Sequence, residues 1–241
     1  MNPIKALIQR LPGGRALTER MSFRRRQKKL ERIGDAEDRF THIYDQNKWK
    51  DGESRSGAGS SLKTTAELRA ALPGLFEELK VRRFLDAPCG DYNWFRLVDR
   101  DDEFHYIGGD IVQALIDANA SAYADEKTEF IHQDITKDAL PNVDMWLCRD
   151  CLIHLSFEDI DRAVQNFLAS DIPYWLVTTH TNVDRNIDIP TGHCRMINLE
   201  IEPFNFGEPL RYVEDTDHDG TGKTLGLWER EALRAALDAR G

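Results

Sequence analysis

The stretch Phe84-Leu85-Asp86-Ala87-Pro88-Cys89-Gly90-Asp91-Tyr92-Asn93-Trp94 decides how this chain folds. An apolar strand here ends in Asp86, a tight turn containing Gly90 follows, and residues 94–98 are compatible with a helix. A strand, a glycine turn and a helix in this order form the first unit of a nucleotide-binding α/β domain, where backbone N–H groups and a helix N-terminus provide a polar cradle. The stretch therefore predicts a nucleotide-like ligand at this turn.

Strand and helix patterns alternate from residue 75 onward. The strand patterns cover residues 83–87, 104–109, 129–133, 143–148 and 174–179, and the helix patterns cover about 93–99, 111–122, 136–139 and 157–169. Such alternation predicts a parallel sheet with right-handed crossovers. Residues 210–214 and 224–228 flank a polar turn and predict a closing antiparallel hairpin, followed by a helix at 229–239. We expect an α/β, Rossmann-like fold with a mostly parallel seven-stranded sheet and a C-terminal antiparallel hairpin.

The charge of the chain is divided unevenly. The 241 residues carry a net charge of −10, yet residues 1–32 hold ten Lys or Arg and only two acidic side chains. Residues 33–241 therefore carry a net charge of −18, and an acidic domain argues against general nucleic-acid binding. Four cysteines, the lack of a signal-peptide pattern and the lack of an apolar run near the ~20 residues of a membrane span predict a cytoplasmic protein.

Residues 1–39 are predicted to form a basic helical N-terminal arm. Four apolar residues of the arm share one helical face: Ile4, Leu7, Ile8 and Leu11. Basic residues occupy the other face, so residues 1–32 could contact the inner membrane surface or a protein partner. The arm could equally lie as a solvated helix across the core.

Residues 40–74 are predicted to form a lid segment. Aromatic residues are followed by a Ser- and Gly-rich run at 54–61, which leads into a helix at about 62–72. The run could be a plain linker. Trp49 and Arg55 beside it favour a loop that folds over a ligand.

Three acidic residues stand at or just after the ends of three predicted strands. They are Asp86, Asp110 and Asp134. Ligands of an open parallel sheet lie across the C-terminal strand ends, so these carboxylates are expected to line one crevice. Asp110 follows Gly90 by 20 residues, the spacing of an acid that accepts ribose hydroxyls. Asp134 could accept from an exocyclic amine such as that of adenine.

The set resembles a class I S-adenosylmethionine (SAM)-dependent methyltransferase. Asp86, Pro88, Gly90 and Tyr92 stand where that family has an acid and alternating glycines, so one glycine of the pattern is kept. The Asp-Ala-Pro-Cys-Gly-Asp motif resembles a bacterial subgroup that modifies glycans or small molecules, and the resemblance covers about residues 40–230. It implies SAM as cofactor and residues 75–241 as the SAM-binding catalytic domain. It implies these cofactor-binding residues: Trp49, Arg55, Ser56, Asp86, Ala87, Gly90, Asp110, Ile111, Asp134, Ile135 and Arg149.

The resemblance also implies where methyl transfer takes place. Residues after the fourth strand face the transferable methyl in the family, so Asp150 or His154 could accept the proton of a hydroxyl acceptor, with His180 after the fifth strand as a rival. Residues 181–209 are rich in Asn, Asp and Arg, which suit a polyhydroxylated acceptor. We therefore expect O-methylation of a sugar, a glycan or a similar small polar molecule.

Other classes of protein fit less well. A nicotinamide dinucleotide enzyme needs a G-x-G-x-x-G turn for its pyrophosphate, which this chain lacks. Cys148 and Cys151 form one C-x-x-C without a second, so no metal is expected. Two alternatives stay open: a protein or RNA methyltransferase, and a non-catalytic cofactor-binding scaffold recruited through its basic arm.

Overall fold

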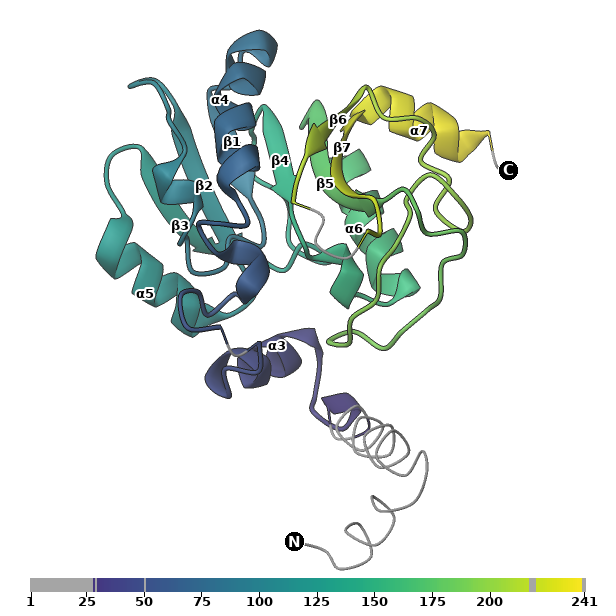
Figure 1. Ribbon diagram of the computed structural model, residues 1–241, viewed down its shortest axis with the longest axis horizontal. Coiled ribbons are helices and arrows are strands. Elements are labelled where there is room, and N and C mark those ends of the chain that lie inside the picture. The colour runs from purple at the N-terminus through teal and green to yellow at the C-terminus, as the bar shows by residue number, and fades with distance from the viewer. Residues whose placement is uncertain (1–27, 29, 50, 217–219, 240–241) are drawn as a thin grey trace, which may run out of the picture.

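The computed structural model describes residues 28, 30–49, 51–216 and 220–239. Within these residues the chain forms a seven-stranded sheet in the order β3-β2-β1-β4-β5-β7-β6 (Figure 1). The strands are β1 (Arg83–Asp86), β2 (His105–Asp110), β3 (Thr128–His132), β4 (Met145–Cys148), β5 (Tyr174–His180), β6 (Arg211–Glu214) and β7 (Lys223–Glu229). Strands β1 to β5 pair in parallel, and β7 is antiparallel to β5 and β6. The expected fold class and hairpin are confirmed.

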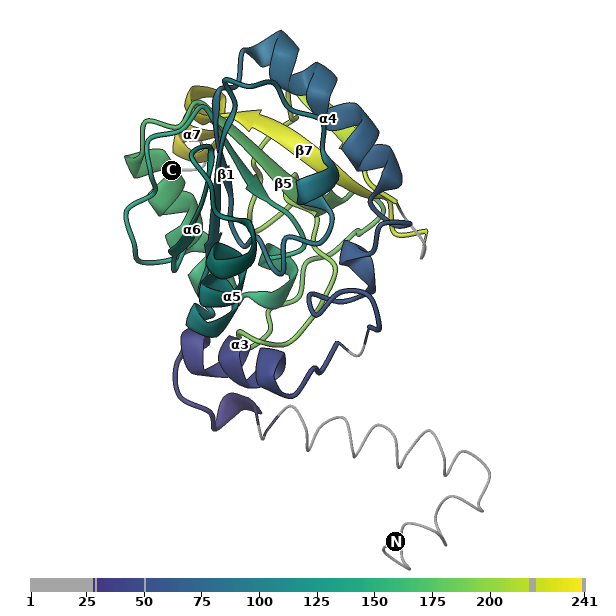
Figure 2. The ribbon, with the colours of Figure 1, turned by 90° about the vertical axis from the view of Figure 1, so that its left-hand side faces the viewer.

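Helices cover both faces of the sheet. They are α4 (Ala66–Leu79) and α5 (Gln113–Tyr123) on one face, α6 (Phe157–Ala169) and α7 (Arg230–Asp238) on the other, and α3 (Ala36–Asp45) at one end of the domain. Figure 2 shows α4 on one side of the strands and α6 and α7 on the other. Two cores result because successive strand residues point to opposite faces.

Each core is built around aromatic rings. Phe84 of β1 packs among Phe76, Phe95 and Tyr106 on the α4 face. Trp146 and Trp175 stack on the α6 face, with their ring centroids 4.7 Å apart. These rings are fully or almost fully buried, so their removal from water stabilises the fold on both faces of the sheet.

Three helix predictions were wrong in part. Residues 93–99 form only a 3₁₀ turn, η2 (Phe95–Leu97), because the apolar run is one turn long and the Asp-rich segment after it has low helix propensity. A helix was expected at 136–139, but residues 135–138 form a single turn, in which the Lys137 and Asp138 N–H groups donate to the Asp134 carbonyl, and no helix continues from it. The helix expected at 62–72 instead begins at Ala66 and continues to Leu79.

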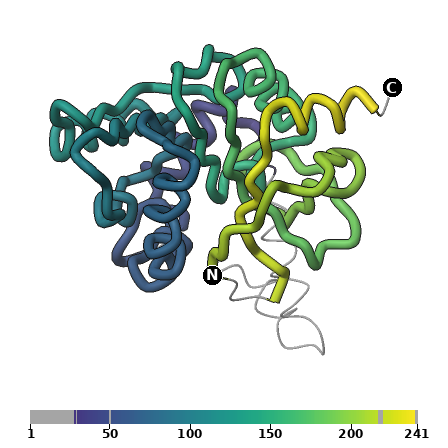
Figure 3. The backbone as a smooth tube through the Cα atoms, turned by 90° about the horizontal axis from the view of Figure 1, so that it is seen from above, coloured from purple at the N-terminus to yellow at the C-terminus, as the bar shows by residue number. Residues whose placement is uncertain are grey.

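The N-terminal segments pack onto the sheet. Helix α4 contacts β6 (Figure 3). Glu78 of α4 forms an ion pair with Arg211 of β6. The arm and lid boundaries expected at 39 and 74 fall inside α3 and α4, respectively. Residues 1–27, where most of the basic arm was expected, lie outside the described residues. The described helices include none that is both long and apolar enough to traverse a bilayer.

The Phe84→Ala substitution should destabilise the fold strongly, because it leaves a cavity among Phe76, Phe95 and Tyr106. We expect a loss of about 3–5 kcal/mol in the free energy of unfolding, measured by urea denaturation. Leu97→Ala is the control, since Leu97 lies in the same region but is 44% exposed. Equal losses in the two variants would contradict this account of the core.

Candidate functional site

A cavity of about 400 Å³ lies at the C-terminal ends of the parallel strands. Asp86 ends β1, Asp110 ends β2 and Arg149 directly follows β4, and all three line the cavity. Phe40 and Tyr44 of α3 contribute to its wall from the other side. The cavity has the size and position at which α/β sheets bind small ligands.

The structure brings nearly all predicted site residues together. Those that line the cavity are Trp49, Ser56, Asp86, Gly90, Asp110, Ile111, Asp134, Ile135, Arg149, Asp150, His154 and His180. Ala87 is fully buried and instead joins β1 to β4, because its N–H donates to the Leu147 carbonyl. Arg55 stacks its guanidinium 4.5 Å from the Tyr44 ring centroid and donates to the Tyr44 carbonyl. Ala87 and Arg55 therefore do not line the cavity, and their predicted cofactor contacts stay a prediction.

The glycine turn differs from the expected cradle. Gly90 has φ +56°, and its N–H donates to Asp110 Oδ2 at 3.2 Å. A Cβ at this position would lie 2.2 Å from Ser56 Oγ, so the approach of Ser56 also excludes a side chain here. Behind the turn lies η2 rather than an α-helix, so the expected helix N-terminus does not contribute to the site.

Asp86 and Asp110 are buried carboxyl groups. Burial raises the pKa of Asp86 to about 7, although Tyr106 Oη donates to Asp86 Oδ2 at 2.8 Å. Burial likewise raises the pKa of Asp110 to about 6, against the hydrogen bonds from the backbone N–H groups of Val112 and Gly90. Neither carboxylate forms an ion pair with a side chain of the described residues. This end of the cavity therefore suits a cationic ligand, which would stabilise both ionised carboxylates.

The third strand-end acid, Asp134, is held by its own loop. Its Oδ1 accepts from the N–H of Thr136 at 2.9 Å, and its Oδ2 lies 3.0 Å from Lys137 Nζ. These contacts outweigh burial and lower the pKa of Asp134. The carboxylate stays ionised, which suits the predicted role as a hydrogen-bond acceptor for an exocyclic amine.

The end of β4 carries a paired charge cluster. Arg149 bonds Asp215 through Nε and Nη2, both at 2.9 Å, and Asp150 Oδ2 lies 2.8 Å from Lys223 Nζ. Burial alone would raise the pKa of Asp150, but Arg149 and Lys223 hold it at about 2. Asp150 is therefore a poor proton acceptor at neutral pH.

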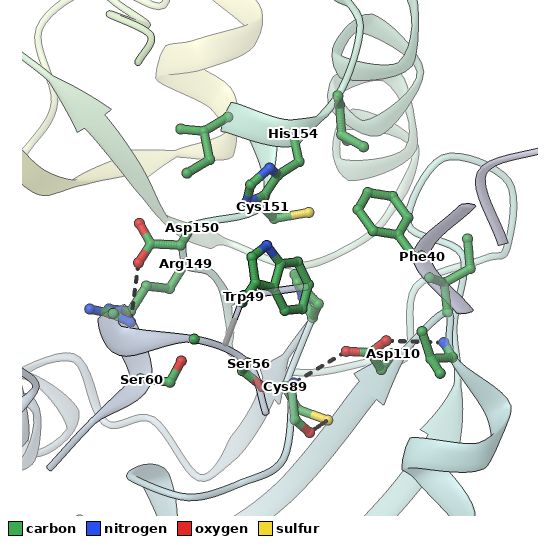
Figure 4. Close-up of a pocket in the computed structure, with 18 of the residues that line it drawn as sticks. Phe40, Trp49, Ser56, Ser60, Cys89, Asp110, Arg149, Asp150, Cys151 and His154 are labelled. Carbon is green, nitrogen blue, oxygen red and sulfur yellow. Dashed lines mark hydrogen bonds and ion pairs between the residues drawn. The ribbon is translucent and has the colours of Figure 1, made fainter. Parts of the chain in front are cut away.

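His154 presents a free acceptor nitrogen instead. Its Nδ1 is 2.7 Å from the His193 carbonyl and donates to it, so in the neutral ring Nε2 is the acceptor. Burial lowers the pKa of His154, which keeps the ring neutral at pH 7. Its ring centroid lies 5.9 Å from that of Trp49 (Figure 4). Of the predicted bases, His154 has the protonation state that proton abstraction requires. The role of His180 as a rival base stays a prediction.

Residues after β5 hold His154 and the turn that carries it in position. Arg195 donates to the carbonyls of Leu152 and Leu155 at 2.6 and 2.8 Å, and so holds the 3₁₀ turn η3 (Leu152–His154). Some polar side chains of residues 181–209 bond within this segment: Asn186 Nδ2, for example, donates to the Asn198 and Glu202 carbonyls. Others bond to neighbouring elements, as Asn182 Nδ2 does to the Gly220 carbonyl. From residues 181–209 the cavity is lined by Cys194, Arg195 and Met196. Of the Asn, Asp and Arg side chains expected to face an acceptor, only Arg195 lines it.

Several lining residues carried no clear sequence signal. They are Phe40, Tyr44, Cys194, Met196 and Lys223. The aromatic character of residues 40–49 hinted at the first two. The others reach the cavity only through the path of the chain after β5 and the β6–β7 pairing, which local sequence patterns do not specify.

Known proteins share this fold. No protein-family model matches the chain, and no curated protein matches its sequence. The methyltransferase domain of bacterial CtHen1 gives a TM-score of 0.53 at 12% identity, over 69% of this chain and 99% of that one. Magnesium protoporphyrin IX methyltransferase (ChlM) from Synechocystis PCC 6803, solved with bound SAM, gives a TM-score of 0.53 at 13% identity, over 83% of this chain and 99% of that one. The pyocyanin biosynthetic protein PhzM gives a TM-score of 0.53 at 15% identity, over 70% of this chain and 56% of that one. These likenesses establish the methyltransferase fold.

The pH dependence of stability should change when Asp86 is replaced by Asn. A folded-state pKa of about 7, against an ordinary value of 3.8, stabilises the fold at low pH, and this contribution is lost as pH rises through about 7. Between pH 5 and pH 7 the wild type should lose on the order of 2 kcal/mol of unfolding free energy that Asp86→Asn retains. Urea unfolding at both pH values measures the difference. Parallel behaviour of the two proteins would refute the raised pKa.

Proposed function

We propose that this chain is a SAM-dependent methyltransferase that methylates an oxygen of a small acceptor. The observation that carries the proposal is the pair of buried carboxylates, Asp86 and Asp110, at adjacent strand ends of a methyltransferase fold. A sulfonium cofactor with an amino-acid group brings positive charge and no phosphate. Buried carboxylates that form no ion pair with the other described side chains fit such a molecule, whereas a pyrophosphate would be repelled.

In this proposal each strand-end acid contacts a different part of the cofactor, as the sequence predicts. Asp110 would accept from the ribose hydroxyls, Asp134 from the adenine amine, and the Asp86–Gly90 turn would hold the amino-acid end. Bound SAM supplies an electrophilic methyl group. The chain's own part is to align the acceptor oxygen with this methyl and to remove the hydroxyl proton.

His154 is the proton acceptor in this proposal. Its Nε2 takes the proton of the acceptor hydroxyl, and the resulting imidazolium is stabilised by the His193 carbonyl at Nδ1 and by the nearby negative charge of Asp150. Arg195 fixes the position of the η3 turn and therefore of the ring. Asp150 contributes charge rather than proton transfer, because Lys223 and Arg149 keep it ionised.

For the acceptor we propose a sugar, a glycan or a similar small polar molecule. The support comes from the polar groups at the His154 end of the cavity, where Asp150, Arg195 and Lys223 form part of the wall. These groups can accept from or donate to several hydroxyls. Trp49 offers an aromatic face beside them.

SAM affinity measured by isothermal titration should depend on Asp110 and on pH. Asp110→Asn should weaken binding at least tenfold, because it removes a buried negative charge. Wild-type affinity should fall as pH drops below about 7, since Asp86 and Asp110 must then lose protons to bind a cation. The exposed Asp102→Asn is the control. Absence of SAM binding at any pH would refute the proposed function.

Methyl transfer from labelled SAM to a small-molecule extract tests His154. His154→Gln should lower turnover by about 10²–10⁴. Wild-type turnover should be level at neutral and alkaline pH and fall only at acidic pH, as the ring takes up a proton, because burial lowers the pKa of His154. His105→Gln is the control and should behave as wild type, because His105 begins β2 at the end of the strand away from the cavity. Full turnover of His154→Gln would exclude this residue as the base.

A further inference from the structure

Asp91 lies beside the cavity and binds the segment that covers it. Its Oδ1 accepts from Ser54 Oγ at 3.0 Å and from Ser56 Oγ at 3.3 Å, and its Oδ2 accepts from the N–H of Arg55 at 2.8 Å. The N–H of Asp91 in turn donates to Ser56 Oγ at 3.0 Å. Three consecutive residues of the covering segment are therefore bonded to one residue of the glycine turn.

Asn93 adds a second attachment two residues later. Its Nδ2 donates to Glu53 Oε1 at 2.8 Å and to the Ser60 carbonyl at 3.0 Å. Glu53 Oε1 also accepts from the N–H of Leu62 at 2.7 Å. Residues 53–62, which we name the cover, are thus bonded along their length to the turn at 91–93.

The cover forms a wall of the cavity, while Asp91 itself does not line it. Ser56, Gly57 and Ser60 all line the cavity. Gly57 lies against Trp49, because a Cβ on Gly57 would be 3.2 Å from Trp49 Cβ. A Cβ on Gly59 would be 3.1 Å from Asp150 Oδ2. The position of the cover thus determines the shape of the cavity wall between Gly90 and Asp150.

Little regular structure holds the cover in place. Its one regular element is the single 3₁₀ turn η1 (Ala58–Ser60), which makes no sheet pairing. Hydrogen bonds to a carboxylate are roughly twice as strong as those between neutral groups. Three of the four carboxylate hydrogen bonds between the cover and residues 91–93 are made by Asp91, and the fourth joins Asn93 to Glu53. Asp91 therefore supplies most of the charge-assisted restraint on the cover.

We propose that Asp91 is a positioning residue that fastens the cover over the cavity and sets how long the bound cofactor stays. This inference rests on the proposed function, since it takes SAM as the ligand. Lifting of residues 54–56 would open the cavity between Ser56 and Gly90, which both line it. Loss of the carboxylate should then speed SAM release without removing any group that lines the cavity.

Stopped-flow displacement of bound SAM by excess S-adenosylhomocysteine tests this directly, with tryptophan fluorescence as the signal. Asp91→Asn should release SAM at least tenfold faster than wild type. Ser54→Ala should release it faster by a smaller factor, and should add little in the Asp91→Asn background, because both changes break the same contact. Asp125→Asn is the matched control: Asp125 accepts from the N–H of Lys127 in its own turn and lies away from the cover.

Trypsin cleavage after Arg55 gives a second readout that separates fastening from general destabilisation. Cleavage at this bond in the SAM complex should be faster in Asp91→Asn, with an unchanged urea midpoint. Wild-type release and cleavage rates in both Asp91→Asn and Ser54→Ala would overturn the inference. The inference would also be overturned if the free energy of unfolding of Asp91→Asn fell enough to account for its faster cleavage. If the wild type itself bound no SAM, the proposed function would fail instead.

Discussion

The register of β1 between β2 and β4 is the constraint on which the site depends. Asp86 pairs with Gly108 of β2 and with Leu147 of β4, so the three strands end at one edge of the sheet. This edge collects Asp110 and Arg149 beside Asp86, although the three residues are far apart in sequence. A shift of β1 by one residue would turn Asp86 toward a core and Phe84 away from its aromatic partners. Packing and chemistry are therefore fixed by the same pairing.

Electrostatics divides the cavity into two ends. At β1 and β2 the carboxylates of Asp86 and Asp110 are buried and form no ion pair with another described side chain. Burial raises the pKa of both and outweighs the effect of Arg149, which lowers the pKa of Asp86. At β4 the acids Asp150 and Asp215 are matched by Arg149 and Lys223. The first end gains most from a positive ligand. At the second end the acidic and basic side chains already neutralise each other, so this end can contact a neutral polar molecule with little change in charge.

The parts of the site that could be predicted are those whose signal is local. Asp86 and Asp110 follow β-type runs, and the rule that parallel strands present their ligands at one edge places them together. The helix expected at 93–99 failed, because the apolar run that suggested it serves the aromatic core instead. The Asn side chains after β5 do not line the cavity, because they bond to backbone carbonyls, as Asn186 does to Asn198 and Asn182 does to Gly220.

Residues close together in the chain are enough to predict the alternation of strands and helices, the strand-end acids and the glycine turn. The folded arrangement alone shows which nitrogen of His154 accepts, which acids are paired and why Gly90 lacks a side chain. His193 sets the tautomer of His154 from 39 residues away, and Asp91 reaches Ser56 from 35 residues away. Such contacts depend on how distant segments are brought side by side, and no local pattern of residue types encodes that distance.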